Sequence, residues 1–293
     1  MIKNTNDGTN KKPYLRTDIN SGNYNLLPEF STGPKGSEEE IHQAVKNAGY
    51  MGIQGGNPTL CKKYGLGYTG GGRVNNLGEI ESIAKKNQDQ GAECITLHVG
   101  WGMESDQFID ALVGEIINTS EKMNFPIYIE THRATITQDI WRTVELVKRF
   151  PEIRFNGDFS HWYTGLEMVY GGFEKKLEFI QPVLERVRFI HARIGNPGCM
   201  QVDIGDGKDR PYVEHFKAFW TKSFEGFLKT AQPGDYICFN PELLQSNIYY
   251  ARLIKNEKGQ LVEEGDRWEQ AKIYTSIAKE CFQKAQESVA LNK

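Results

Sequence analysis

The sequence predicts an α/β protein built as a single (β/α)8 TIM barrel, and two observations carry this prediction. Short apolar or β-branched runs alternate along the 293 residues with amphipathic stretches of helical period, the pattern of parallel βα units. Eight such runs can be counted, and eight is the number of strands that closes a barrel. The runs cover 26–30, 50–54, 65–69, 94–98, 126–130, 153–158, 187–191 and 236–242. An open doubly wound sheet is the alternative, but no GxGxxG fingerprint follows the first run.

The stretches between the runs carry helix-end signals. Ser37 and Glu40 form a capping-box pattern at the start of one stretch, and Gly49 and Gly91 stand where helix ends need a left-handed residue. Only the connection between the second and third runs is short and lacks a clear helix. The chain closes with an amphipathic stretch at 267–288. The other predicted helices cover 37–49, 77–91, 105–123, 137–150, 173–187 and 212–230.

Domain organisation follows from length and composition. The length allows about two domains, but single α/β barrels often reach this size. Residues 1–25 are rich in Asn, Lys, Gly and Thr, a composition typical of a loose arm. We therefore expect a flexible N-terminal arm over 1–25 and one barrel with its C-terminal helix over 26–293.

The charge and the cysteines exclude several classes of partner. A net charge of -3 gives no support for a surface that binds nucleic acid or an anionic membrane. The sequence holds no 18 consecutive apolar residues, and its start lacks the apolar core of a signal peptide. Five scattered cysteines without a CxxC pair indicate reduced thiols. We expect a cytoplasmic protein without nucleic-acid or membrane partners, whose apolar helix faces would permit a homo-oligomer.

The ends of the last five runs carry side chains that can bind a metal or move a proton. In chain order they are His98, Glu130, Asp158, His191 and Glu242. In a parallel barrel the carboxyl ends of the strands share one rim, where functional residues gather. Two Glu, one Asp and one His around one point would repel one another without a cation. This oxygen-rich set with a single imidazole favours Mn²⁺, Mg²⁺ or Co²⁺, with Zn²⁺ as an alternative.

Such a centre favours proton transfer at carbon. A divalent ion can polarise a carbonyl and a neighbouring hydroxyl at once. Glu130 and Glu242 would then lie on opposite sides of a bound substrate, where either could move a proton. The stretch IYIETHR at 127–133 thus delivers a metal-ligating base to the mouth of the barrel.

The order of these residues resembles that of the xylose isomerase-like TIM barrels, over roughly residues 25–285. The resemblance rests on Glu130, a DxxH pattern at Asp158 and His161, His191 followed by Arg193, and Glu242. This group includes sugar and sugar-phosphate isomerases and epimerases, hydroxypyruvate isomerase, inosose dehydratase and endonuclease IV. A trinuclear zinc site like that of endonuclease IV needs histidines on early strands and a DxH pair after the seventh, and this sequence offers neither.

The resemblance implies residue roles like those of ketose 3-epimerases. One divalent metal would be bound by Glu130, Asp158, His191 and Glu242. The two glutamates would also be the catalytic acid/base pair, exchanging a proton through a cis-enediolate. His161 and Arg193 would hold substrate oxygens. The sequence departs from many relatives in the ETHR stretch and in the SNIYYARL segment after the eighth strand.

Other polar and aromatic residues near the strand ends could have either a functional or a structural role. Trp101 and Trp162 lie where aromatic rings often line a sugar pocket, and packing between loops is the alternative. His98 could reach the substrate or hydrogen-bond a neighbouring carbonyl. Arg133 could bind a phosphate or carboxylate of the substrate, or form an ion pair with a nearby acid. His132 could lie in the shell around the metal ligands.

We therefore expect a divalent-metal-dependent isomerase or epimerase of a small sugar or keto-polyol. A metal-dependent lyase is the alternative within enzymes: a dehydratase of a keto-polyol would use the same enolate chemistry and lose a hydroxyl. A barrel that binds sugar without catalysis is the alternative from another class, since all the ligands could be present in it.

Overall fold

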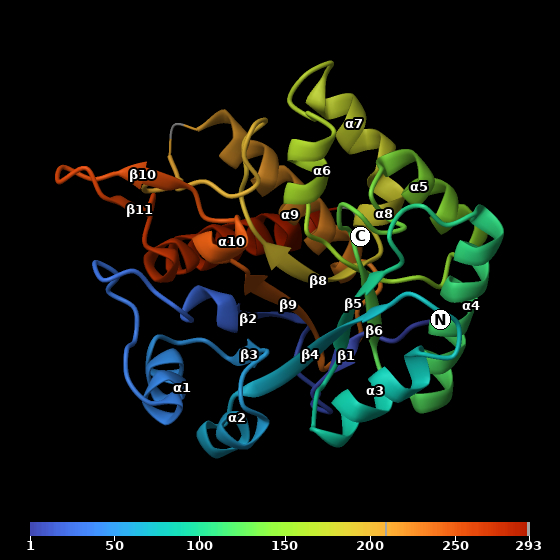
Figure 1. The fold of residues 1–293 in the computed structure, drawn as a ribbon. Coiled ribbons are helices and arrows are strands. Elements are labelled where there is room, and N and C mark those ends of the chain that lie inside the picture. Colours follow the sequence, from blue (N-terminus) through green and yellow to red (C-terminus); the bar gives the residue numbers. More distant parts are fainter. Residues whose placement is uncertain (209, 292–293) are drawn as a thin grey trace.

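A closed parallel barrel forms the centre of the molecule (Figure 1). The computed structural model describes residues 1–208 and 210–291, and eight parallel barrel strands lie within them. These are β2 (Tyr14–Asn20), β3 (Gly52–Gln54), β4 (Gly67–Val74), β5 (Ile95–Val99), β6 (Ile127–Glu130), β7 (Phe155–Asn156), β8 (Val187–Ala192) and β9 (Asp235–Pro241). Parallel pairing of β9 with β2, with Leu15 opposite Ile237, closes the ring. The predicted barrel is confirmed, and its closure excludes the open sheet.

Helices cover the outside of the barrel (Figure 1). They are α1 (Glu38–Asn47), α2 (Pro58–Tyr64), α3 (Ile80–Asp89), α4 (Asp106–Met123), α5 (Ile140–Arg149), α6 (Ser160–Gly165), α7 (Phe173–Phe179), α8 (Gln181–Leu184), α9 (Pro211–Leu228) and α10 (Arg267–Leu291). The capping box of Ser37 and Glu40 forms as predicted. Gly49 and Gly91 adopt the expected left-handed backbone, with φ of 87° and 84°.

Two helical details differ from the sequence-based expectation. The connection between the second and third runs contains α2, a seven-residue helix begun by Pro58 and capped by the side chain of Asn57. It is too short to show an amphipathic period. The single helix expected over 173–187 is divided into α7 and α8 at Ile180, two residues before Pro182. Proline lacks the backbone N–H that a continuous helix would need there.

The expected arm over 1–25 is wrong, because residues 14–20 form the first barrel strand. A short strand before it, β1 (Thr5–Asn6), pairs antiparallel with β9. The sequence pattern misled because β2 carries two charges, Arg16 and Asp18. Inside the barrel their side chains pair at 2.7 Å and are only 5% and 0% exposed. The run at 26–30, expected to be the first strand, forms turns instead.

An insertion separates the last barrel strand from the closing helix. It begins with a short 3-10 turn at Ser246–Ile248 and continues into an antiparallel hairpin of β10 (Leu253–Lys255) and β11 (Leu261–Glu263). The hairpin projects away from the barrel at the left of Figure 1. Within the described part of the chain, no helix combines the length and apolarity of a membrane span. All five cysteines are free thiols.

Candidate metal centre

Four predicted metal ligands meet at the carboxyl ends of neighbouring strands. Glu130 ends β6, Asp158 follows β7 by two residues, His191 lies in β8, and Glu242 follows β9 directly. One donor atom from each lies within 4.8 Å of the others. The first three side chains are at most 4% exposed, and Glu242 is half-buried. The structure therefore brings together the set that the sequence predicted.

Asn156 holds two of these ligands at the end of β7. Its Nδ2 donates to Glu130 Oε2 at 3.0 Å, and its Oδ1 accepts the backbone N–H of His191 at 2.9 Å. Asn156 is fully buried and bridges β6 to β8. Sequence reasoning missed this residue, although it stands within the predicted run 153–158, two positions before Asp158.

Gln54 sets which nitrogen of His191 faces the other ligands. Its amide nitrogen donates to Gly70 O at 3.2 Å and Thr96 Oγ1 at 3.0 Å, so its oxygen points to His191 Nε2, 2.6 Å away. Because an amide oxygen only accepts, His191 Nε2 carries the proton. Nδ1, the nitrogen left to bind a metal, then faces Glu130 Oε2 at 3.1 Å. This is the outer-shell hydrogen bond that commonly orients a metal-binding imidazole.

Unsatisfied buried atoms show that the set fits a cation. Asp158 Oδ2 and His191 Nδ1 are buried without a hydrogen-bond partner. The other carboxylate oxygen of Asp158 already accepts from the hydroxyl and the backbone N–H of Ser160, at 2.6 and 3.1 Å. Their contacts are ion pairs at 3.1 to 3.4 Å with neighbouring side chains, and a divalent ion would bind both atoms directly. Three carboxylates and one imidazole suit Mn²⁺, Mg²⁺ or Co²⁺, and also Zn²⁺.

The pKa values show how strongly the site favours positive charge. Burial alone would raise the pKa of Glu130, but the nearby His191 and His98 hold it well below its usual range. Burial opposes the charged form of His191, yet Glu242 and Glu130 raise its pKa to about 9. Without a metal, a proton on His191 therefore balances the carboxylates. A bound cation would replace that proton.

Arg193 pairs with two of the predicted metal ligands, Asp158 and Glu242. Its guanidinium lies 3.3 Å from Asp158 Oδ2, forms an ion pair with Glu242 Oε2, and donates from Nε to Glu242 O at 3.0 Å. Burial would raise the pKa of Asp158, but the charges of Arg193 and then His161 lower it. Arg193 is 1% exposed, so its present contacts are with the ligands. Its predicted contact with substrate stays a prediction.

Three imidazoles lie against one another beside Glu130, with neighbouring ring planes tilted by 40° and 45°. The ring of His132 lies 4.1 Å from that of His98 and 3.7 Å from that of His161. His161 is 1% exposed, and its Nε2 lies 3.3 Å from Asp158 Oδ2. Burial, and then the neighbouring His161, lowers the pKa of His132 to about 3. His132 is therefore neutral and lies next to Glu130.

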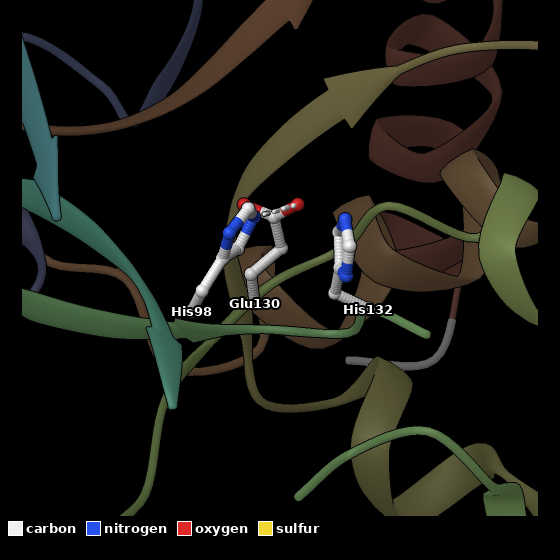
Figure 2. A group of neighbouring side chains, drawn as sticks. All are labelled: His98, Glu130 and His132. Atoms are coloured by element: carbon white, nitrogen blue, oxygen red, sulfur yellow. Dashed lines mark hydrogen bonds and ion pairs between the residues drawn. The ribbon is translucent and has the colours of Figure 1, made fainter. Parts of the chain in front are cut away.

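His98, Glu130 and His132 form a second group of potential ligands, drawn in Figure 2. His98 Nε2 lies 3.2 Å from Glu130 Oε1. The other ring nitrogen lies 3.4 Å from Arg73 Nη2, and a guanidinium only donates. His98 Nε2 therefore carries the proton and donates it to Glu130. This arrangement positions Glu130 and leaves His98 no lone pair for a second cation.

The remaining predicted residues lie in different environments. Trp101 is 50% exposed, and the guanidinium of Arg73 lies 4.0 Å from its ring centre. Trp162 is fully buried and donates from Nε1 to Thr137 O at 2.7 Å. The prediction that Trp162 binds substrate is therefore wrong, because its ring packs in the core and its one donor is used. Arg133 is exposed at the end of the ETHR stretch.

Tyr250 is a residue at this rim that sequence reasoning did not single out. Its ring centre lies 4.5 Å from the guanidinium carbon of Arg193 and 5.6 Å from that of Arg133. The tyrosine comes from the segment after β9, within the stretch SNIYYARL. The unusual composition of that stretch was the available signal, but it gave no indication of which side chain reaches the rim.

The closed barrel with its ligand cluster has the fold of the xylose isomerase-like TIM barrels. A D-tagatose 3-epimerase-like protein superposes with a TM-score of 0.55 at 13% identity, covering 94% of this chain and 99% of that one. A xylose isomerase-like TIM barrel protein from Mycobacterium smegmatis, in complex with magnesium, gives 0.54 at 10% identity, covering 92% and 96%. No protein-family model and no curated protein matches the sequence. At these identities the likeness shows the fold alone.

Proposed function

We propose that the protein is a divalent-metal-dependent isomerase or epimerase of a small sugar or keto-polyol. The observation that carries the proposal is the pair of buried donor atoms on Asp158 and His191 that make no hydrogen bond and lie within 4.8 Å of donor atoms of the two glutamates. When bound, the metal would polarise the substrate carbonyl and its neighbouring hydroxyl. The chain's own residues would then move a proton at the adjacent carbon.

The environments of the two glutamates suit a proton exchange. Glu130 is held ionised by His191 and His98, whereas burial raises the pKa of Glu242 above its usual range. We assign the two glutamates to the acid and base roles, one removing the proton from carbon and the other returning it. His98 and Asn156 orient Glu130 through its two oxygens, and Asn20 donates to Glu242 Oε1 at 3.2 Å.

The metal is tested first. Elemental mass spectrometry of purified wild type should find about one Mn, Co, Mg or Zn per chain, and the variant Asp158→Ala should lose it. Asp206→Ala, which removes an exposed carboxylate outside the cluster, is the control and should keep the metal. A wild type that holds no metal and takes none up would overturn the proposal.

The reaction is tested by solvent exchange. Keto sugars incubated in deuterated water with the loaded enzyme should gain deuterium at the carbon next to the carbonyl. Glu130→Gln and Glu242→Gln should each abolish exchange, while Glu145→Gln, a change on helix α5 that removes an ion pair with Lys148, should keep it. Loss of a hydroxyl from the product would indicate a dehydratase. Tight binding without any exchange would indicate a sugar-binding barrel, and full activity of both glutamine variants would refute the assigned roles.

A further inference from the structure

We propose that the substrate carries an anionic group, a carboxylate or a phosphate, and that Arg73 and Arg133 bind it at the barrel mouth. The inference rests on the proposed function and adds the class of substrate. It comes from the surroundings of these two arginines, neither of which pairs with a residue of the metal centre. One belongs to β4 and the other to the loop after β6.

Arg73 lies one imidazole away from a metal ligand. Its Nη1 donates to Gly100 O at 2.7 Å, and its Nη2 contacts His98, which in turn donates to Glu130. The guanidinium has five N–H donors, so these two contacts leave further donors for a ligand. The ring of Trp101 lies against the guanidinium at 4.0 Å. Such stacking holds the planar fork in place for two-pronged recognition of an oxyanion.

Arg133 lies in the loop after β6, three residues beyond Glu130. Its guanidinium is 5.6 Å from the ring centre of Tyr250, whose ring also lies over Arg193. Arg193 in turn pairs with Glu242. The ring of Tyr250 and the side chain of Arg193 therefore lie between Arg133 and this second proposed metal ligand. The two arginines are thus connected to different proposed metal ligands. Contacts lead from Arg73 through His98 to Glu130, and from Arg133 through Tyr250 and Arg193 to Glu242.

Neither arginine is neutralised by the protein. Within residues 1–208 and 210–291, neither guanidinium forms an ion pair with a carboxylate; the contacts of Arg73 are a carbonyl, an imidazole and an indole ring. The acid closest in sequence to Trp101, Glu104, accepts instead from the backbone N–H groups of Trp101 and Gly102 at 2.7 and 2.8 Å. Of the two interpretations for Arg133, the structure therefore favours the substrate anion over the ion pair.

The experiment compares three ligands that share one carbon chain. Erythritol, D-erythronate and D-erythritol 4-phosphate are titrated calorimetrically into Mn²⁺-loaded and metal-free protein. We expect at least one anion to bind about tenfold or more tightly than erythritol, and the tighter of the two identifies the group as carboxylate or phosphate. Charge-assisted hydrogen bonds are strong enough for Arg73→Gln and Arg133→Gln each to weaken that anion about tenfold. Erythritol binding should not change.

Arg252→Gln is the matched control, because Arg252 is a surface arginine already paired with Glu264 at 3.2 Å. It should leave all three affinities unchanged. If the Arg73→Gln/Arg133→Gln double variant keeps the full preference for an anion, the metal binds that anion and the proposal is overturned. An equal loss for erythritol would also overturn it, since the arginines would then act on the whole site. Absence of bound metal would count against the proposed function, whereas the metal-free titrations still test the arginines.

Discussion

Replacing Gln54 with Met tests whether hydrogen bonding beyond the ligands builds the metal centre. Met keeps the length and volume of the side chain but removes the acceptor for His191 Nε2, which lies 2.6 Å from Gln54 Oε1. The same oxygen accepts from Asn240 at 2.9 Å and from Asn20 at 3.0 Å. Without it, His191 loses the contact that keeps its Nδ1 directed at Glu130.

The expected loss of metal affinity follows from the bond to His191, one of several that Gln54 makes. Removing an outer-shell hydrogen bond of a metal ligand typically lowers metal affinity about 10- to 100-fold. A tenfold change corresponds to about 1.4 kcal/mol, so the loss in binding free energy is about 1.4 to 2.8 kcal/mol. The substitution also leaves a buried imidazole N–H without a partner, which costs about 1–3 kcal/mol of folding stability.

The assay is a Co²⁺ titration against a competing chelator, with circular dichroism as the check of folding. The matched control is Gln270→Met, because Gln270 is also buried and hydrogen-bonded, to Gly205 O and the backbone N–H of Ile204, but lies outside the metal centre. That variant should lose stability and keep wild-type metal affinity. A folded Gln54→Met protein that binds Co²⁺ as tightly as wild type would refute the role assigned to Gln54.

Three further predictions follow from single contacts. Metal must displace the proton of His191, whose pKa is about 9 without metal, so chelator competition should show affinity rising about tenfold per pH unit below pH 9; a flat profile would contradict this. Trp162→Phe should destabilise the fold by about 1 kcal/mol in urea unfolding, through the lost bond to Thr137, and leave turnover unchanged; a selective rise in KM would restore the substrate role. Gly226→Ala should lower Tm markedly, because a Cβ would lie 2.4 Å from the Cα of Glu185; an unchanged Tm would show that α9 shifts freely.

The sequence alone was sufficient for the barrel and for its ligand cluster. Seven of the eight predicted runs are barrel strands, because strands buried on both faces read as continuous apolar segments whatever lies around them. The four ligands could be predicted to meet for a related reason. Parallel strands of one barrel end at one rim, so a residue's position at a strand end decides its place in the molecule.

The tertiary structure decided which polar residues are buried together. Arg16 and Asp18 gave β2 the look of a surface segment, and only their pairing inside the barrel shows why it is the first strand. Gln54 and Asn240 are distant in the chain, yet their contact helps to aim His191. Local periodicity records whether a side chain is apolar, whereas a buried charge or amide is stable only through partners from elsewhere in the chain. Those partners exist only once the barrel has closed.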